Sequence, residues 1–171
     1  PLDTGLFSVW IPEVAFIDSA KNVNLVSNTL TLRYDTIRPQ AEIYAVEEDT
    51  TNKEEVKLKM EFSEKVNHFT QSDIQVINGT LTGFLEDSAG VSYSMIVKPK
   101  SIGIIYVNLP QNTVVDSAGN FNLREEFRFV FDDINPNPVF QTEVPDSTNI
   151  SEIPVELKFD EKVTGFTLTD I

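Results

Sequence analysis

Apolar and polar residues alternate along many short stretches of the chain, and this alternation predicts β-strands. The clearest case is "VKLKMEF" at residues 56–62, where Val56, Leu58, Met60 and Phe62 fall on one face of a strand. Similar stretches predict further strands at residues 41–46, 73–77, 80–86, 91–97, 103–109 and 126–131. No stretch has the period of an amphipathic helix. The sequence therefore predicts an all-β fold with about seven strands in this region.

Two long stretches of the sequence occur twice. Residues 62–74 match residues 159–171 without a gap at a spacing of 97, and residues 11–22 match residues 109–120 at a spacing of 98. These matches divide the chain into three parts. Residues 1–34 are the C-terminal part of one repeat, residues 35–131 are a complete repeat, and residues 132–171 are the N-terminal part of the next. We expect the chain to belong to a longer array.

The length of the repeat limits the folds that it can form. A repeat of 97 residues is longer than the units of roughly 20–50 residues that stack in solenoid proteins. It has the size of an immunoglobulin-type sandwich. The predicted fold is therefore a series of tandem immunoglobulin-like β-sandwich domains, each with its own core.

The complete repeat reads "FSEKVNHFTQSDIQVINGTLTGF" at residues 62–84, and "VDSAGN" follows at residues 115–120. This pattern resembles the bacterial Ig-like domains that occur in tandem on large surface proteins and adhesins. In that family, F-S-E-x-V leads to F-T-x-x-D-I-x-V-x-N-G, and a D-x-A-G-N turn follows. The flanking parts carry the portions expected of them, so the resemblance covers the whole chain and implies an extracellular or cell-surface location.

One position departs from the family pattern. Lys21 stands in "DSAKN" where the pattern has glycine. A positive φ at this position would cost a lysine about 1 kcal/mol or more. We therefore expect the turn to adapt its backbone there.

Composition and charge exclude several classes of function. The formal net charge of −14 argues against nucleic-acid binding, because phosphates would be repelled, and it favours divalent cations wherever carboxylates gather. The chain has no cysteine and one histidine, which excludes disulfides, thiol chemistry and a multi-histidine zinc site. No apolar run approaches the length of a membrane span. Paired carboxylates for glycoside hydrolysis would need a cleft that a narrow sandwich rarely offers, so we expect no catalytic activity.

Three carboxylates are predicted to meet at one end of the complete repeat. Chain entry, the loop after the second strand and the loop before the last strand share one end of an Ig-type sandwich. They carry Asp35, Glu64 and Asp116. Calcium takes six to eight oxygen ligands, which suits such a set. A local alternative stays open, in which Asp116 caps its own turn and Glu64 faces Lys65 or solvent.

The same set recurs in the flanking repeats. Asp132 and Glu161 match Asp35 and Glu64, and Asp133 lies beside them as a further candidate calcium ligand. Asp18 matches Asp116 in the preceding repeat.

The segments that begin two successive repeats are "DTIRPQAEI" (35–43) and "DDINPNPVF" (132–140). They share only an Asp, an Ile and a Pro, and they predict a proline-stiffened linker with an acidic start. The loop at 47–55 is charged, and Glu48 and Asp49 in it are weak candidate cation ligands.

Two asparagines fit the N-glycosylation pattern, Asn78 and Asn149. Asn149 falls in a loop. Asn78 precedes Gly79, and Asn-Gly is also what a two-residue type I′ hairpin turn prefers. The single histidine, His68, aligns with Gly165 and is expected to be a surface loop residue.

The leading functional hypothesis is a structural or adhesive extracellular stalk or fibre segment, stiffened by short linkers and by calcium at the junctions between repeats. Its partners would be the neighbouring repeats of the same chain, and beyond them other copies in a filament or a surface ligand. Two alternatives stay open. One is a carbohydrate- or protein-binding module, and the other is an accessory domain of a secreted enzyme.

Overall fold

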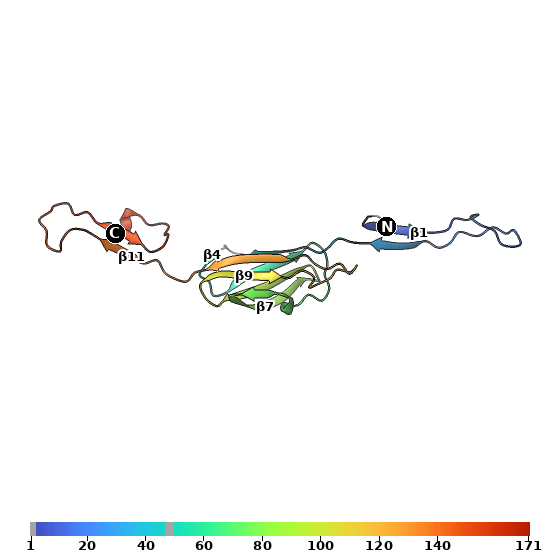
Figure 1. Cartoon of the computed structure of the whole chain (residues 1–171), viewed down its shortest axis with the longest axis horizontal. Coiled ribbons are helices and arrows are strands. Elements are labelled where there is room, and N and C mark those ends of the chain that lie inside the picture. The colour runs from blue at the N-terminus through green and yellow to red at the C-terminus, as the bar shows by residue number, and fades with distance from the viewer. Residues whose placement is uncertain (1–2, 47–49) are drawn as a thin grey trace. The chain divides into compact units, whose positions relative to one another are not determined.

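The computed structural model describes residues 3–46 and 50–171 and is all-β, as the sequence predicts. Glu48 and Asp49, two candidate cation ligands, lie outside the described residues. The chain forms two compact units, residues 1–132 and residues 133–171, which are described separately. The first unit contains an N-terminal segment (residues 3–34) and a central sandwich (residues 35–131). Figure 1 shows the strands of both units.

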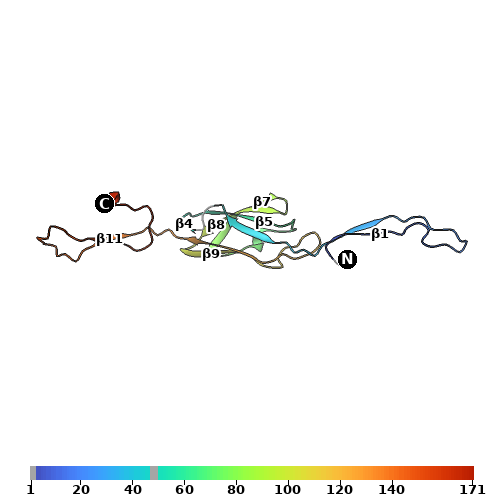
Figure 2. The ribbon, with the colours of Figure 1, turned by 90° about the horizontal axis from the view of Figure 1, so that it is seen from above.

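Two four-stranded sheets form the two layers of the central sandwich (Figures 1 and 2). One sheet has the order β3 (Ala41–Ala45), β5 (Val56–Phe62), β8 (Ser92–Pro99) and β7 (Gly79–Ser88). The other has the order β4 (Thr50–Thr51), β10 (Glu125–Phe131), β9 (Gly103–Leu109) and β6 (Gln75–Ile77). Neighbouring strands are antiparallel, except that β4 runs parallel to β10. The strand predictions are confirmed, and β4 is an addition.

The core lies between the two sheets, where every second residue of β5 is buried. Side chains from both layers meet there and are almost completely buried: Leu58, Met60, Met95, Val97, Ile105, Val107 and Phe129. Phe69 packs edge-on against Phe62 and Tyr93, with ring centroids 5.1 and 4.7 Å away. Each large apolar side chain in such a position contributes about 1.5–3 kcal/mol through burial. In β5, the alternation in the sequence therefore identifies the face of the strand that packs in the core.

The hairpin predicted at Asn78-Gly79 is wrong. Strand β6, before this dipeptide, pairs with β9, whereas β7, after it, pairs with β8 in the opposite sheet. Asn78 does adopt a left-handed backbone, with φ of 59°. The dipeptide thus turns a corner between the two layers, which needs the same local conformation as a hairpin turn.

The N-terminal segment reproduces one hairpin of the central sandwich. Strand β1 (Gly5–Val9) pairs with β2 (Leu30–Tyr34) in the same register in which β9 pairs with β10. The turn at Lys21 does not adapt, contrary to expectation. Lys21 keeps a left-handed backbone with φ of 70°, as its counterpart Gly119 does with φ of 90°.

Residues 133–171 reproduce another strand pair of the central sandwich, that of β3 with β5. Strand β11 (Pro138–Gln141) pairs with β12 (Glu156–Phe159), and Phe140 faces Leu157 as Ile43 faces Met60. Short 3₁₀ turns follow at Leu168–Asp170 here and at Gln71–Asp73 in the central sandwich, each preceded by a threonine with the same capping hydrogen bonds. The local structure of each end segment is therefore encoded within that segment.

The end segments differ from the central sandwich in burial. Phe140 is 58% exposed where its counterpart Ile43 is 4% exposed. Val155 is 57% exposed where its counterpart Leu58 is 1% exposed. In the N-terminal segment, Phe7 is 41% exposed, and its counterpart Ile105 is fully buried. Each end segment thus keeps the hairpins but leaves their apolar faces uncovered.

Candidate metal centre

Three carboxylates meet at the end of the central sandwich where the chain enters it. Asp35 directly follows β2, Glu64 follows β5, and Asp116 lies in the loop between β9 and β10. One carboxylate oxygen from each lies within 4.8 Å of the other two. The structure therefore brings together the three residues that the sequence predicts to meet.

Asp116 is held in place by its own loop. Its side chain is buried, its Oδ1 accepts hydrogen bonds from Ala118 N and Asn120 N at 2.8 and 2.9 Å, and its Oδ2 accepts one from Asn120 Nδ2 at 2.9 Å. Burial alone would raise the pKa of Asp116, but these hydrogen bonds outweigh it and the pKa lies below its ordinary value. Asp116 is therefore charged at neutral pH and positioned by the backbone. Its turn-capping role and a role as a metal ligand are compatible.

Glu64 is the carboxylate of the three whose charged form is disfavoured. Burial raises the pKa of Glu64, and the charges of Asp116 and Asp35 raise it further, while Arg33 opposes the shift. The Arg33 Nε lies 3.6 Å from Asp35 Oδ2. Asp35 Oδ1 also accepts a hydrogen bond from Ile37 N at 3.0 Å. Three carboxylates share their cleft with two cationic side chains, those of Arg33 and Lys65, which leaves a local excess of negative charge.

A hard divalent cation fits this geometry. Oxygens that share one calcium ion lie about 2.3–2.6 Å from it, and therefore up to about 5 Å from one another. The three residues line an open cleft together with Arg33, Lys65, Ser117 and Ala118. Asp35, Glu64 and Asp116 would hold the ion, and water would complete its shell.

The other predicted ligands are not gathered in this way. Among residues 3–46 and 50–171, the group of Asp35, Glu64 and Asp116 is the one in which three potential ligands converge. Asp132 follows β10 and its backbone N–H donates to Thr51 O at 3.0 Å. Asp133 and Glu161 belong to the second unit and are exposed. Asp18, which corresponds to Asp116, belongs to no such group among the described residues. A calcium role for Asp18, Asp132, Asp133 and Glu161 stays a prediction.

The two glycosylation candidates have different surroundings. The Asn78 side chain is engaged on both sides, because Nδ2 donates to Ser101 O at 3.0 Å and Oδ1 accepts from Ser101 Oγ at 2.7 Å. Asn149 is exposed in a loop of the second unit.

His68 is exposed in a loop with φ of 63°, and its counterpart Gly165 has φ of 82°. That position therefore calls for a left-handed backbone and not for an imidazole.

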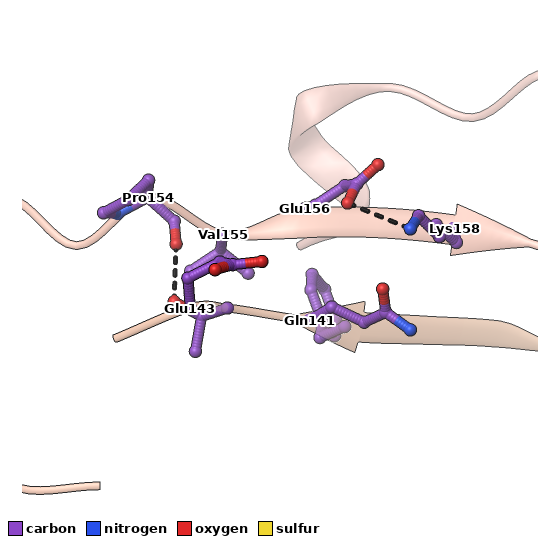
Figure 3. Close-up of a pocket in the computed structure, with 8 residues that line it drawn as sticks. Gln141, Glu143, Pro154, Val155, Glu156 and Lys158 are labelled. Atoms are coloured by element: carbon purple, nitrogen blue, oxygen red, sulfur yellow. Dashed lines mark hydrogen bonds and ion pairs between the residues drawn. The ribbon is translucent and has the colours of Figure 1, made fainter. Parts of the chain in front are cut away.

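The cleft drawn in Figure 3 lies along β11 and β12 in the second unit. Three of its lining residues, Phe140, Thr142 and Val155, correspond at the repeat spacing to Ile43, Ala45 and Leu58, which belong to the core of the central sandwich or pack against it. The cleft therefore lies beside residues whose counterparts are covered in a complete repeat.

A further polar cluster lies at the same end of the sandwich and was not predicted from the sequence. Arg38, in the entry segment, donates to two backbone carbonyls and one side-chain oxygen of the loop between β9 and β10. Backbone acceptors carry no residue-type signal, so such contacts can be found only in a folded structure.

A family model described as the bacterial Ig-like domain matches residues 35–129, which is more than half of the chain. The chain belongs to the bacterial Ig-like domain family. The matched region coincides with the two-layered central sandwich. Domains of this family are typically non-catalytic structural or adhesive modules, and they are usually extracellular or surface-associated. No curated protein and no solved structure matches the chain.

The part of the chain that the structure describes contains no helix of the length and apolar character needed to cross a membrane.

Proposed function

We propose that this bacterial Ig-like chain is a structural, non-catalytic segment of an extracellular or cell-surface stalk or fibre built from tandem Ig-like repeats. The observation that supports this most directly is the agreement between the end segments and the central sandwich. Strands β1 and β2 repeat the pairing of β9 and β10, and β11 and β12 repeat that of β3 and β5.

The agreement extends to individual hydrogen bonds. Asn24 Oδ1 accepts from Ala15 N and Phe16 N at 2.7 and 2.9 Å, as Asn122 Oδ1 accepts from Thr113 N and Val114 N at 2.8 and 2.9 Å. Shared residue types alone would not need shared contacts. Together with the uncovered apolar faces, these contacts support the view that each end segment is part of a further sandwich of the same kind.

Small-angle X-ray scattering of the 171-residue chain tests the stalk. A stalk segment is expected to have a radius of gyration well above the value of about 16 Å for a compact chain of this length. A radius near that value would mean that the chain folds back on itself, which contradicts a role as a spacer.

The second part of the proposal is that calcium binds Asp35, Glu64 and Asp116. The ion would neutralise the carboxylates at the point where the N-terminal segment joins the central sandwich. Its binding would hold the entry, the loop after β5 and the loop after β9 together, and so would stiffen this junction.

Thermal unfolding of the whole chain in calcium and in chelator tests the cation. At a calcium concentration about a hundredfold above the dissociation constant, binding stabilises the folded state by about 2.7 kcal/mol, which raises the Tm of a domain of this size by about 10 °C or more. Glu64→Gln should abolish the increase, and the matched variant Glu161→Gln should keep it. Equal Tm values in calcium and in chelator would contradict calcium binding at this site, but they would not contradict the structural role.

A further inference from the structure

Arg38 makes three hydrogen bonds from the entry segment to the loop between β9 and β10. Its Nε donates to Phe121 O at 2.7 Å, and its Nη2 donates to Asn122 O and to Asn112 Oδ1, also at 2.7 Å. The side chain is half-buried. A planar guanidinium with several donors can satisfy acceptors in different directions at once, which a lysine ammonium on a flexible stem does less well.

The backbone around Arg38 is fastened to the same loop. Pro39 is fully buried, and its carbonyl accepts a hydrogen bond from Leu123 N at 2.9 Å. One residue further, Gln40 N donates to Ser63 Oγ at 3.0 Å. At the start of the segment, Asn120 Nδ2 donates to Asp35 O at 3.1 Å. Four of the six residues 35–40, namely Asp35, Arg38, Pro39 and Gln40, are thus bonded to the rest of the central sandwich.

The contact belongs to this entry in particular. Position 135, which matches Arg38 at the repeat spacing, is an asparagine, whose short side chain lacks the reach and the fork of donors. Val14 stands where the central sandwich has Asn112, and it offers no acceptor. Both partners of the Arg38–Asn112 pair therefore change between repeats.

We propose that Arg38 clamps residues 35–40 onto the central sandwich and makes this entry segment a fixed part of it. The clamp shortens the stretch of chain that is free to bend at this junction. This inference rests on the proposed structural role, because a fixed entry segment would make a stalk stiffer at this junction. It does not depend on a bound cation, because none of the acceptors of Arg38 is a carboxylate.

Amide hydrogen exchange of the whole chain, followed residue by residue by NMR, tests the clamp. Leu123 N and Gln40 N are the reporters, because each bonds across the boundary between the entry segment and the rest of the sandwich. In Arg38→Ala, exchange at both amides is expected to rise about tenfold or more, since hydrogen bonds to a charged donor are the strong ones. Arg38→Lys should resemble Arg38→Ala, because it restores the charge without the fork.

Two references separate the clamp from a general loss of stability. Amides of β5 should exchange at their original rate in every variant. Arg124→Ala removes an exposed arginine that pairs with Glu126 and should leave Leu123 N and Gln40 N unchanged.

Asn112→Gly provides a milder test if Arg38→Ala does not fold. It removes one of the three acceptor contacts, and glycine adopts the left-handed φ of 61° at this position without strain. A smaller rise in exchange at Leu123 N, with β5 unchanged, would support the clamp. Unchanged exchange at both reporters in Arg38→Ala, or an equal rise at the reporters and in β5, would overturn it. Neither result would affect the scattering and calcium tests of the proposed function.

Discussion

Replacement of Asn122 by alanine should be among the most damaging single substitutions in the central sandwich. Asn122 is fully buried in the loop between β9 and β10. Its Oδ1 accepts from the backbone N–H groups of Thr113 and Val114, and its Nδ2 donates to the carbonyls of Pro110 and Leu123 at 2.8 and 2.7 Å. One side chain thus satisfies four backbone groups of a loop that has little regular structure.

The expected loss follows from these four contacts. Alanine would leave two N–H donors and two carbonyl acceptors without this partner. A hydrogen bond contributes about 1 kcal/mol net, and a buried group left unsatisfied costs about 1–3 kcal/mol. The free energy of unfolding should therefore fall by about 4 kcal/mol, which is a large part of the 5–15 kcal/mol typical of a domain.

Urea denaturation followed by circular dichroism is the suitable assay. The single tryptophan, Trp10, lies in the N-terminal segment, so tryptophan fluorescence would not report on the central sandwich. Asn24→Ala is the matched control, because Asn24 makes the corresponding four hydrogen bonds in the N-terminal segment. It should leave the unfolding midpoint of the central sandwich unchanged.

A loss below about 1 kcal/mol in Asn122→Ala, with the m-value unchanged, would refute the reasoning. It would mean that water reaches the freed backbone groups or that the loop rearranges at little cost.

Three further predictions concern other parts of the first and second units. Gly90→Ala should lower the free energy of unfolding by about 2–3 kcal/mol in urea denaturation, because φ is +70° and the new Cβ would lie 2.6 Å from Val66 O; an unchanged midpoint would contradict this. Because the pKa of Glu64 is raised in the folded state, its ionisation costs stability as the pH rises through that pKa. Glu64→Gln in chelator should therefore raise the Tm at pH 7, and the gain should vanish below about pH 4; a gain that persists in acid would show another cause. Leu58→Ala should cost about 3 kcal/mol, because it removes a fully buried side chain, whereas Val155→Ala at the matching exposed position should not move the midpoint; equal effects would contradict the difference in burial.

The sequence by itself determined the strands and their inward faces. The alternation at residues 56–62 coincides with the bounds of β5, and every second residue of that strand is buried. A strand repeats every two residues, so a run of alternating side chains can bury only one of its faces. The immunoglobulin-type sandwich predicted from the repeat also indicated that Asp35, Glu64 and Asp116 would meet, because chain entry, the loop after the second strand and the loop before the last strand share one end of such a sandwich.

Local turn signals left the pairing of strands undecided. Asn78-Gly79 favours a left-handed backbone, and that conformation serves both a hairpin and a corner between sheets. Only the pairing of β6 with β9 and of β7 with β8 shows which of the two forms. At Lys21, the hydrogen bonds of the Asp18 turn keep φ positive against the preference of lysine.

Contacts between distant backbone groups were decided by the tertiary structure alone. Arg38 bonds to carbonyls 83 and 84 residues away along the chain. Every residue has a carbonyl, so the sequence around Phe121 and Asn122 gives no sign that an arginine will bind there. Side-chain periodicity specifies the strands and the core, whereas the packing of the two sheets brings Arg38 to these acceptors and turns the entry segment from a predicted linker into part of the sandwich.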